Sequence, residues 1–128
     1  MSLPDHVLSA EYVNLATFRK NGDAIATPIW AAEVDGKLYA FSAGNAGKVK
    51  RLRNSARAQV VPCTAGGKLL GTWQDANAYI VDDPSEAEAA NRALKAKYGW
   101  KMTLTDLGSK LTGRHSKRAI LRIEGPES

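Results

Sequence analysis

A group of positive residues, Gly47-Lys48-Val49-Lys50-Arg51-Leu52-Arg53, has the composition and spacing that suit the binding of an anion. Five of the 18 positive side chains lie within ten positions, at Lys48, Lys50, Arg51, Arg53 and Arg57. On a helix Lys48 and Arg51 share a face because they are three residues apart. The first turn of such a helix also presents unpaired N–H groups and the positive end of its dipole, which favour a phosphate. Composition leaves a second interpretation open, a solvated helix face.

The sequence offers no familiar arrangement of catalytic side chains. His6 and His115 lack a Cys or carboxylate partner at metal-ligand spacing, so we expect surface residues and no metal site. Cys63 falls in an apolar run, which favours a buried thiol over a nucleophile. Asp82-Asp83 fits a helix cap better than an acid/base pair, and no nucleophile elbow, P-loop or dinucleotide fingerprint occurs. If the chain is an enzyme, we expect a bound cofactor to supply the reactivity.

Nucleic acid is another possible ligand of the same positive residues. The aromatic residues Tyr39, Phe41 and Trp73 would stack bases beside a basic groove, as in single-strand binders. The formal net charge of +5 is mild, and outside Lys48–Arg57 the positive residues are scattered among acids. A nucleic-acid-binding barrel is therefore a remote alternative.

Length and composition predict one soluble domain. A chain of 128 residues forms a single domain, here residues 1–128, and 44% hydrophobic with 24% charged residues is ordinary for a globular protein. We find no apolar run long enough for a membrane span and no signal peptide in Met1–His6. The single Cys63 cannot form an internal disulfide. These features favour a cytoplasmic location.

The first two thirds of the chain read as strands joined by tight turns. The expected strands are Tyr12–Phe18, Ala24–Val34, Lys37–Ser42, Ala58–Thr64 and Leu69–Val81, with turn signals at Asn21-Gly22, Asp35-Gly36 and Gly66-Gly67. Asn21-Gly22 predicts a type I′ turn. Such a meander closes into a barrel, which removes its exposed edges. Pro28 cannot donate a ladder hydrogen bond, so it marks an edge or a bulge with backbone groups free to meet a ligand.

Helices interrupt and follow these strands. A short helix is expected between Ser42 and Ala58, with Asn45 as N-cap and Val49 and Leu52 buried. Asp83-Pro84-Ser85-Glu86 predicts the start of a second helix with a capping carboxylate, whose apolar face is Ala87, Ala90, Leu94 and Tyr98. A shorter stripe follows at Leu104, Leu107 and Leu111, ending at Gly113, and the last expected strand is Lys117–Glu124.

The order of these parts resembles one known family. The motifs are Leu15-Ala16-Thr17-Phe18-Arg19-Lys20-Asn21-Gly22, Ala26-Thr27-Pro28-Ile29-Trp30, Leu38-Tyr39-Ala40-Phe41-Ser42, the basic segment above, and Val60-Val61-Pro62-Cys63-Thr64. From about Tyr12 to Glu124 the chain is similar to the pyridoxamine 5′-phosphate oxidase-like split β-barrels, specifically their flavin/deazaflavin oxidoreductase branch. The resemblance implies a mainly β fold with flanking helices: a six- to seven-stranded antiparallel split β-barrel that forms a homodimer, with two cofactors at the subunit interface.

The same resemblance implies a set of cofactor-binding residues. Lys48, Lys50 and Arg51 would hold the phosphate, and Thr27, Pro28, Ile29 and Trp30 would line the tricyclic ring. Ser42 and Ala43 would approach the ribityl chain, while Trp73 and Gln74 would come from the second subunit.

The implied function is hydride transfer between a bound deazaflavin, coenzyme F420, and a small unsaturated organic substrate, without an obligatory side-chain acid or base. FMN is the alternative cofactor, since members with the same barrel bind it, and a non-catalytic flavin- or tetrapyrrole-binding protein is the alternative function. Pyridoxamine oxidases have a C-terminal segment with arginines that grips the substrate phosphate. Here only Ala119–Ser128 follows Arg118, and nothing in it supplies that grip, so vitamin B6 oxidation is not expected.

Overall fold

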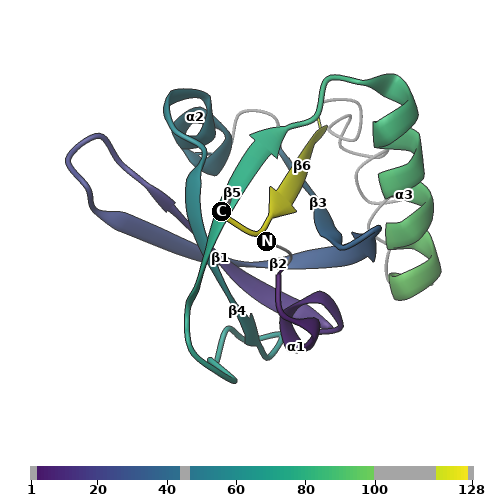
Figure 1. Ribbon diagram of the computed structural model, residues 1–128, viewed down its shortest axis with the longest axis horizontal. Coiled ribbons are helices and arrows are strands. Elements are labelled where there is room, and N and C mark those ends of the chain that lie inside the picture. Colours follow the sequence, from purple (N-terminus) through teal and green to yellow (C-terminus); the bar gives the residue numbers. More distant parts are fainter. Residues whose placement is uncertain (1–2, 44–46, 100–117, 127–128) are drawn as a thin grey trace.

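Six antiparallel strands form a closed barrel in the order β1-β2-β3-β6-β5-β4, with helices packed on its outside (Figure 1). The computed structural model describes residues 3–43, 47–99 and 118–126, without the side chains of Ala43 and Arg118. The elements are α1 (Asp5–Leu8), β1 (Tyr12–Phe18), β2 (Ala24–Val34), β3 (Lys37–Ala43), α2 (Gly47–Asn54), β4 (Arg57–Cys63), β5 (Gln74–Ile80), α3 (Pro84–Tyr98) and β6 (Arg118–Glu124). The mainly β antiparallel barrel is confirmed.

Alternate residues of each strand fill the barrel, as the two-residue period of a strand requires. Leu15 of β1 lies opposite Thr27 of β2 on one side and Val60 of β4 on the other. The fully buried apolar side chains of the interior are Val13, Leu15, Leu38, Ala40, Val60, Ala78, Leu121 and Ile123. β6 comes last in sequence but lies between β3 and β5, so it completes the closure.

The predicted turns at Asp35-Gly36 and Asn21-Gly22 differ in geometry. Asp35 and Gly36 both have positive φ, 53° and 80°, and join β2 to β3 as a two-residue hairpin. The type I′ prediction for Asn21-Gly22 is wrong, because of this pair only Gly22 has a positive φ, of 95°. The Gly22 N–H donates to Arg19 O, and the Arg19 N–H donates to Asp23 O, which makes a three-residue loop. Asn21 Oδ1 accepts from the Asp23 N–H at 3.0 Å and holds this longer turn.

The predicted strand Leu69–Val81 is wrong in its first part. β5 begins only at Gln74, and residues 64–73 form a loop attached to β4 by one bridge between Cys63 and Leu69. The loop crosses the outer side of β4, where a Cβ on Gly71 would lie 4.0 Å from Val61. Leu69 and Leu70 are 44% and 60% exposed, so the adjacent apolar residues follow no alternation and do not behave as a strand.

α3 begins and packs largely as predicted. The Asp83 carboxylate accepts from the Ser85 N–H at 3.1 Å, and Pro84 follows as the first helical residue. Ala90, Leu94 and Tyr98 are buried against the outer side of β2 and β3. The predicted stripe at Leu104, Leu107 and Leu111 with its end at Gly113, and the predicted cap Asn45, lie outside the described residues.

α1 was not predicted, since four residues are too few to show a helical period. Its Val7 and Leu8, with Leu3 before them, join the core of the barrel.

The carboxylate of Glu86 bonds to the barrel instead of to the helix cap. Its Oε2 accepts from the Tyr39 hydroxyl at 2.6 Å, and Oε2 and Oε1 both accept from Arg122 Nη1, at 2.9 and 3.0 Å. Arg122 Nε also donates to Glu124 at 2.6 Å. These bonds tie the first turn of α3 to β3 and β6, and the hydrogen bond from Tyr39, then that from Arg122, lowers the pKa of Glu86.

The Glu86→Gln variant should lose about 1–2 kcal/mol of unfolding free energy at pH 7, since a charge-assisted pair becomes a neutral one. Because the folded-state pKa of Glu86 is depressed, its contribution is present above the unfolded pKa and is lost as the pH falls through the folded value. The stability gap between parent and variant should therefore close in acid, as urea midpoints from pH 7 down to pH 3 would show. Glu88→Gln, an exposed neighbour in the same helix, is the matched control. A gap that stays constant with pH would contradict the role of the charge.

Candidate functional site

The burial of α2 fixes which of its positive side chains can act together. Val49 is fully buried and Leu52 is 7% exposed, which confirms the predicted apolar stripe, and the helix contacts β1 and β5 at one end of the barrel. Lys50 and Arg53 are exposed on the opposite side. Lys48 and Arg51 are partly buried at the boundary.

The guanidinium of Arg51 lies at the beginning of its own helix. Its Nε donates to Thr17 Oγ1 at 2.6 Å, and Thr17 is a fully buried residue of β1. A Cβ added to Gly47 would lie 2.8 Å from Arg51 Nη1, so the guanidinium rests against the first residue of α2. Glycine at position 47 makes this close approach possible.

Lys48 also lies at the beginning of α2, close enough to Arg51 for their charges to interact. Burial lowers the pKa of the Lys48 ammonium, and repulsion from Arg51 lowers it further. Within residues 3–43, 47–99 and 118–126, no carboxylate pairs with either cation, and α2 has no acidic residue in its first turn. Two cations and the positive end of a helix dipole therefore meet without a counter-charge, and an anion would relieve the repulsion.

The first part of β2 has a described hydrogen-bonding partner strand on one side only. Ala31–Val34 pair with β3, whereas the described partners of Ala24–Trp30 are all on β1. Pro28 lies in this first part, opposite Asn14, and within the described residues it has no ladder partner on its other side, as expected at an edge. The neighbouring Thr27 has a buried Oγ1 with no hydrogen-bond partner. A buried hydroxyl without a partner is costly, and a ligand acceptor would satisfy it.

The other two predicted ring-lining residues have packed side chains. Ile29 is 7% exposed and belongs to the barrel core. Trp30 points away from the barrel and stacks on Tyr98, with ring centroids 4.8 Å apart, while Phe41 meets it edge-on at 6.2 Å. What these two positions offer a ligand is their backbone on the edge of β2.

The remaining predicted residues lie apart from this group in one chain. Ser42, 7% exposed, and Ala43 end β3, where they pair with β6. Gln74 begins β5 and donates to Thr72 Oγ1 at 3.4 Å, and Trp73 before it is partly buried. β4 and β1 separate Gln74 from Thr27 in the order of the strands.

The described structure does not favour the alternative sites considered from the sequence. Tyr39, 6% exposed, donates its hydroxyl to Glu86, and Phe41 packs against the α3 cluster, so neither presents a free face to a base. Cys63 is 3% exposed and burial raises the pKa of its thiol, as expected for an inert cysteine. In the described part of the chain, no three His, Cys, Asp or Glu residues gather as a metal site. No described helix has the length and apolarity to span a membrane.

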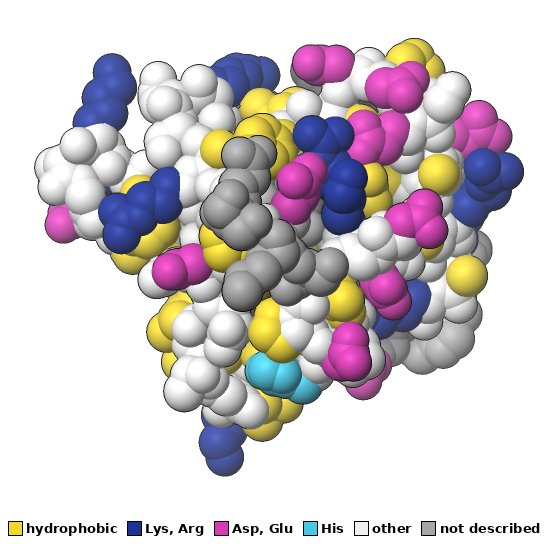
Figure 2. Space-filling view, in the orientation of Figure 1, with side chains coloured by type: hydrophobic (Ala, Val, Ile, Leu, Met, Phe, Trp, Pro, Cys, Tyr) yellow, Lys and Arg dark blue, Asp and Glu magenta, His cyan; other side chains and the backbone are white. Residues whose placement is uncertain are grey.

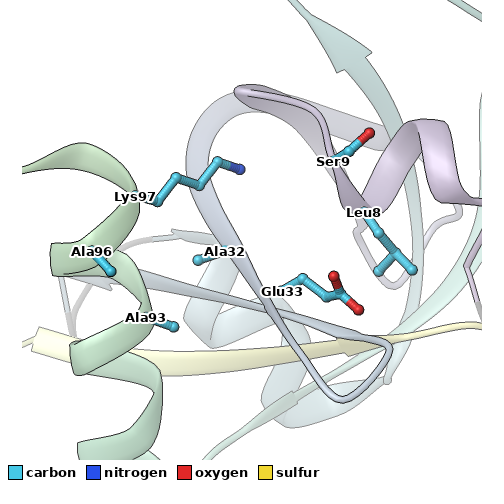
Figure 3. Close-up of a pocket in the computed structure, with 7 residues that line it drawn as sticks. All are labelled: Leu8, Ser9, Ala32, Glu33, Ala93, Ala96 and Lys97. Atoms are coloured by element: carbon cyan, nitrogen blue, oxygen red, sulfur yellow. The ribbon is translucent and has the colours of Figure 1, made fainter.

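A separate open hollow of about 420 Å³ lies between α3 and the end of α1. Figure 3 shows Ala93, Ala96 and Lys97 of α3 on one side, Leu8 and Ser9 on the other, and Ala32 and Glu33 of β2 between them. The Lys97 ammonium already donates to Ala10 O and Ala31 O, and burial lowers its pKa. This lysine joins α3 to β2 and to the segment before β1, and it is not available to a ligand.

Two residues that shape the candidate anion site were not predicted from sequence. Thr17 and Gly47 carry no charge, and their roles depend on Arg51 folding back over its helix. The strand alternation of Val13, Leu15 and Thr17 does place the threonine inward, which was the one available signal.

Comparisons with solved structures identify the fold. No protein-family model and no curated protein matches the sequence. A haem storage protein from Vibrio cholerae aligns with a TM-score of 0.68 at 12% identity, covering 94% of this chain and 84% of that one. An FAD-binding protein from Mesorhizobium loti gives 0.62 at 20%, covering 94% and 82%. A proposed pyridoxamine 5′-phosphate oxidase from Listeria innocua gives 0.59 at 14%, covering 91% and 85%.

Two further neighbours are longer proteins, of which this chain covers 52% and 49%. At these identities the similarity concerns the fold alone. The chain thus has the barrel found in pyridoxamine oxidase-like, flavin-binding and haem-storage proteins.

Proposed function

We propose that this chain binds a flavin-type cofactor, coenzyme F420 or alternatively FMN, and acts as an oxidoreductase on a small unsaturated organic substrate. The observation that carries the proposal is the pair Lys48 and Arg51 at the start of α2, partly buried and without a carboxylate in the described chain. A phosphate is the counter-charge that suits this position.

The residues present fit such a cofactor in three ways. Lys48 and Arg51 would neutralise its phosphate, with Thr17 keeping the guanidinium in place. The backbone of β2 around Pro28, which has no described ladder partner on its second side, would meet the polar edge of the ring. The Thr27 hydroxyl, buried and unsatisfied, would gain an acceptor.

When bound, a reduced flavin or deazaflavin supplies a hydride. The chain's own residues would bind and orient the reactants and exclude water, because no described side chain near the site forms an acid/base pair. In the proposed homodimer, Trp73 and Gln74 of the second copy would complete the site, since two strands lie between β5 and β2 within one chain. Light scattering at twice 13.8 kDa would support the dimer, and the mass of a single chain would contradict it.

The preference for F420 over FMN rests on the sequence resemblance of the Thr27–Trp30 and Lys48–Arg53 motifs to the deazaflavin branch. Among structural neighbours, a flavin-binding protein supports a flavin-type ligand in general. The haem-storage neighbour keeps haem as a ligand to be tested beside it.

Spectroscopic titration of the purified protein with F420, FMN, FAD and haem tests the proposal. We expect saturable quenching of F420 or FMN fluorescence, and faster reoxidation of the reduced cofactor when an unsaturated acceptor such as a quinone is added. If neither F420 nor FMN binds at tens of micromolar, the proposal is refuted. A strong haem Soret shift without flavin binding would assign a tetrapyrrole-binding role instead.

A Thr27→Val variant separates a ligand role of the hydroxyl from a structural one. Valine has the same shape and removes the unsatisfied Oγ1, so the free protein should gain about 1 kcal/mol of unfolding free energy. Cofactor affinity should fall several-fold at the same time. Thermal unfolding of the free protein and fluorescence titration measure the two effects. Higher stability with unchanged affinity would show that the hydroxyl does not meet the cofactor.

A further inference from the structure

A second basic cleft lies at the opposite end of α2 from Lys48. It has a volume of about 290 Å³ and opens between the β1–β2 hairpin and the connection from α2 to β4. Its lining residues are Phe18, Arg19, Lys20, Gly22, Asn54, Ser55 and Arg57. Three of these carry positive charge and none carries negative charge.

The residues around this cleft and along α2 are positive enough to account for the net positive charge of the whole chain. Residues 18–23 and 47–57 hold seven Lys or Arg side chains and one carboxylate, Asp23, whereas the chain as a whole has a formal net charge of +5. Figure 2 shows Lys and Arg side chains on the hairpin arm and over α2, while most acidic side chains on this face lie toward α3. The cleft therefore lies in a positive field, which attracts anions.

The walls of the cleft are held in place before any ligand binds. The Arg57 guanidinium lies over the Phe18 ring, 3.9 Å from its centroid, and the Arg57 N–H donates to Ser55 Oγ at 3.2 Å. The one nearby carboxylate, Asp23, accepts from Asn21 Nδ2 at 3.2 Å within its own turn. No carboxylate of the described chain pairs with Arg19, Lys20 or Arg57.

The carbonyl groups that end α2 would oppose an anion if they were unpaired. One of them, Arg51 O, already accepts from the Ser55 N–H at 3.1 Å, and Asn54 Nδ2 donates to Lys50 O, one residue earlier, at 3.3 Å. The side chains that remain for a ligand are guanidinium and ammonium groups with a hydroxyl beside them, a combination suited to phosphate oxygens.

We propose that this cleft binds the phosphate group of a small phosphorylated ligand, at a site separate from that of the flavin-type cofactor. The inference does not depend on the proposed oxidoreductase function, because none of its residues belongs to the Lys48–Arg51 group. Its size admits a phosphate with a small organic part. Nucleic acid is disfavoured because Arg57 covers the only aromatic ring among the lining residues, which leaves no face for base stacking.

Titration with inorganic pyrophosphate at low salt, followed by ¹H–¹⁵N NMR of the intact protein, tests the site. We expect saturable shifts of the backbone amides of Gly22, Asn54, Ser55 and Arg57, with little change at Gly47 and Lys48. Arg57→Gln should weaken the binding roughly tenfold, as expected for one lost charge-assisted contact. Lys20→Gln serves as a second variant, because Lys20 lies on an exposed turn and its replacement leaves the fold intact.

Arg53→Gln is the matched control, since it removes an exposed charge from the same helix outside the cleft. An equal loss in Arg53→Gln and Arg57→Gln would reduce the effect to general charge attraction and overturn the proposal. Shifts centred on Gly47 and Lys48, or displacement of pyrophosphate by bound FMN, would also overturn it, since the two sites would then be one. A short oligonucleotide that binds far more tightly than pyrophosphate, with a steep salt dependence, would assign the surface to nucleic acid instead.

Discussion

Replacing Lys48 by alanine should weaken binding of the flavin-type cofactor by about 1–3 kcal/mol, the range for losing a charge-assisted hydrogen bond to a phosphate. The loss should be large because Lys48 is partly buried beside Arg51 and the start of α2. Fluorescence titration of parent and variant with F420 and with FMN measures it. An unchanged dissociation constant for both would show that the phosphate does not bind here.

The same substitution should not destabilise the cofactor-free protein, although it weakens cofactor binding. The folded-state pKa of Lys48 is depressed, so its charge destabilises the fold fully below that pKa, and this cost falls as the pH rises from the folded-state pKa to the unfolded-state pKa. Lys48→Ala should therefore leave the thermal midpoint of the free protein unchanged or raise it. Lys50→Ala, from the exposed side of the same helix, is the control and should alter neither affinity nor midpoint. A destabilised Lys48→Ala protein would mean that the lost affinity has a structural cause.

The Tyr98→Phe variant should lose about 1–3 kcal/mol of unfolding free energy, because it leaves buried backbone groups without partners. The Tyr98 hydroxyl accepts from the Ala31 N–H at 2.7 Å and donates to Glu11 O at 2.5 Å. Burial raises the pKa of this hydroxyl, so it stays protonated as a donor at neutral pH. Phenylalanine keeps the stacking on Trp30, so a urea denaturation curve reports the hydroxyl alone.

Tyr79→Phe provides the comparison for this change. Tyr79 is partly buried on β5, where Arg122 lies over its ring, 5.2 Å from the centroid, and no described hydrogen bond uses its hydroxyl. Its loss should cost little. Equal urea midpoints for Tyr98→Phe and the parent protein would show that water replaces the lost hydroxyl at no cost.

The strands were predictable because successive side chains of a strand point to opposite faces of the sheet, which leaves a two-residue alternation in the sequence. Tyr12–Phe18 and Ala24–Val34 have the bounds expected from their alternation, and Asp35-Gly36 made the expected hairpin. The error at Leu69 has a physical cause, since an apolar run interrupted by Gly71 lacks the alternation that a strand needs. Asn21-Gly22 shows that a dipeptide common to several turn types does not choose among them without its neighbours.

The charged residues of the candidate site were predictable from the sequence, but the residues that contact them were not. Lys48 and Arg51 follow from helical spacing, and Pro28 from its missing N–H. The arrangement of Arg51 over Gly47, and its bond to Thr17, depend on how α2 packs on the barrel, which no local pattern encodes. Trp30 is similar: its type fits a ring-stacking role, but α3 supplies Tyr98 as its stacking partner from 68 positions later in the chain.

The place of β6 between β3 and β5 sets the order in which the chain can fold during synthesis. A ribosome delivers β1 to β5 first, and at that stage β3 and β5 are both open sheet edges, since each lacks its β6 partner. Open edges of this kind recruit other strands, so the nascent chain is exposed to edge-to-edge association until residues 118–124 emerge. The barrel thus closes only after β6 has left the ribosome, and until then both edges can pair with strands of other chains.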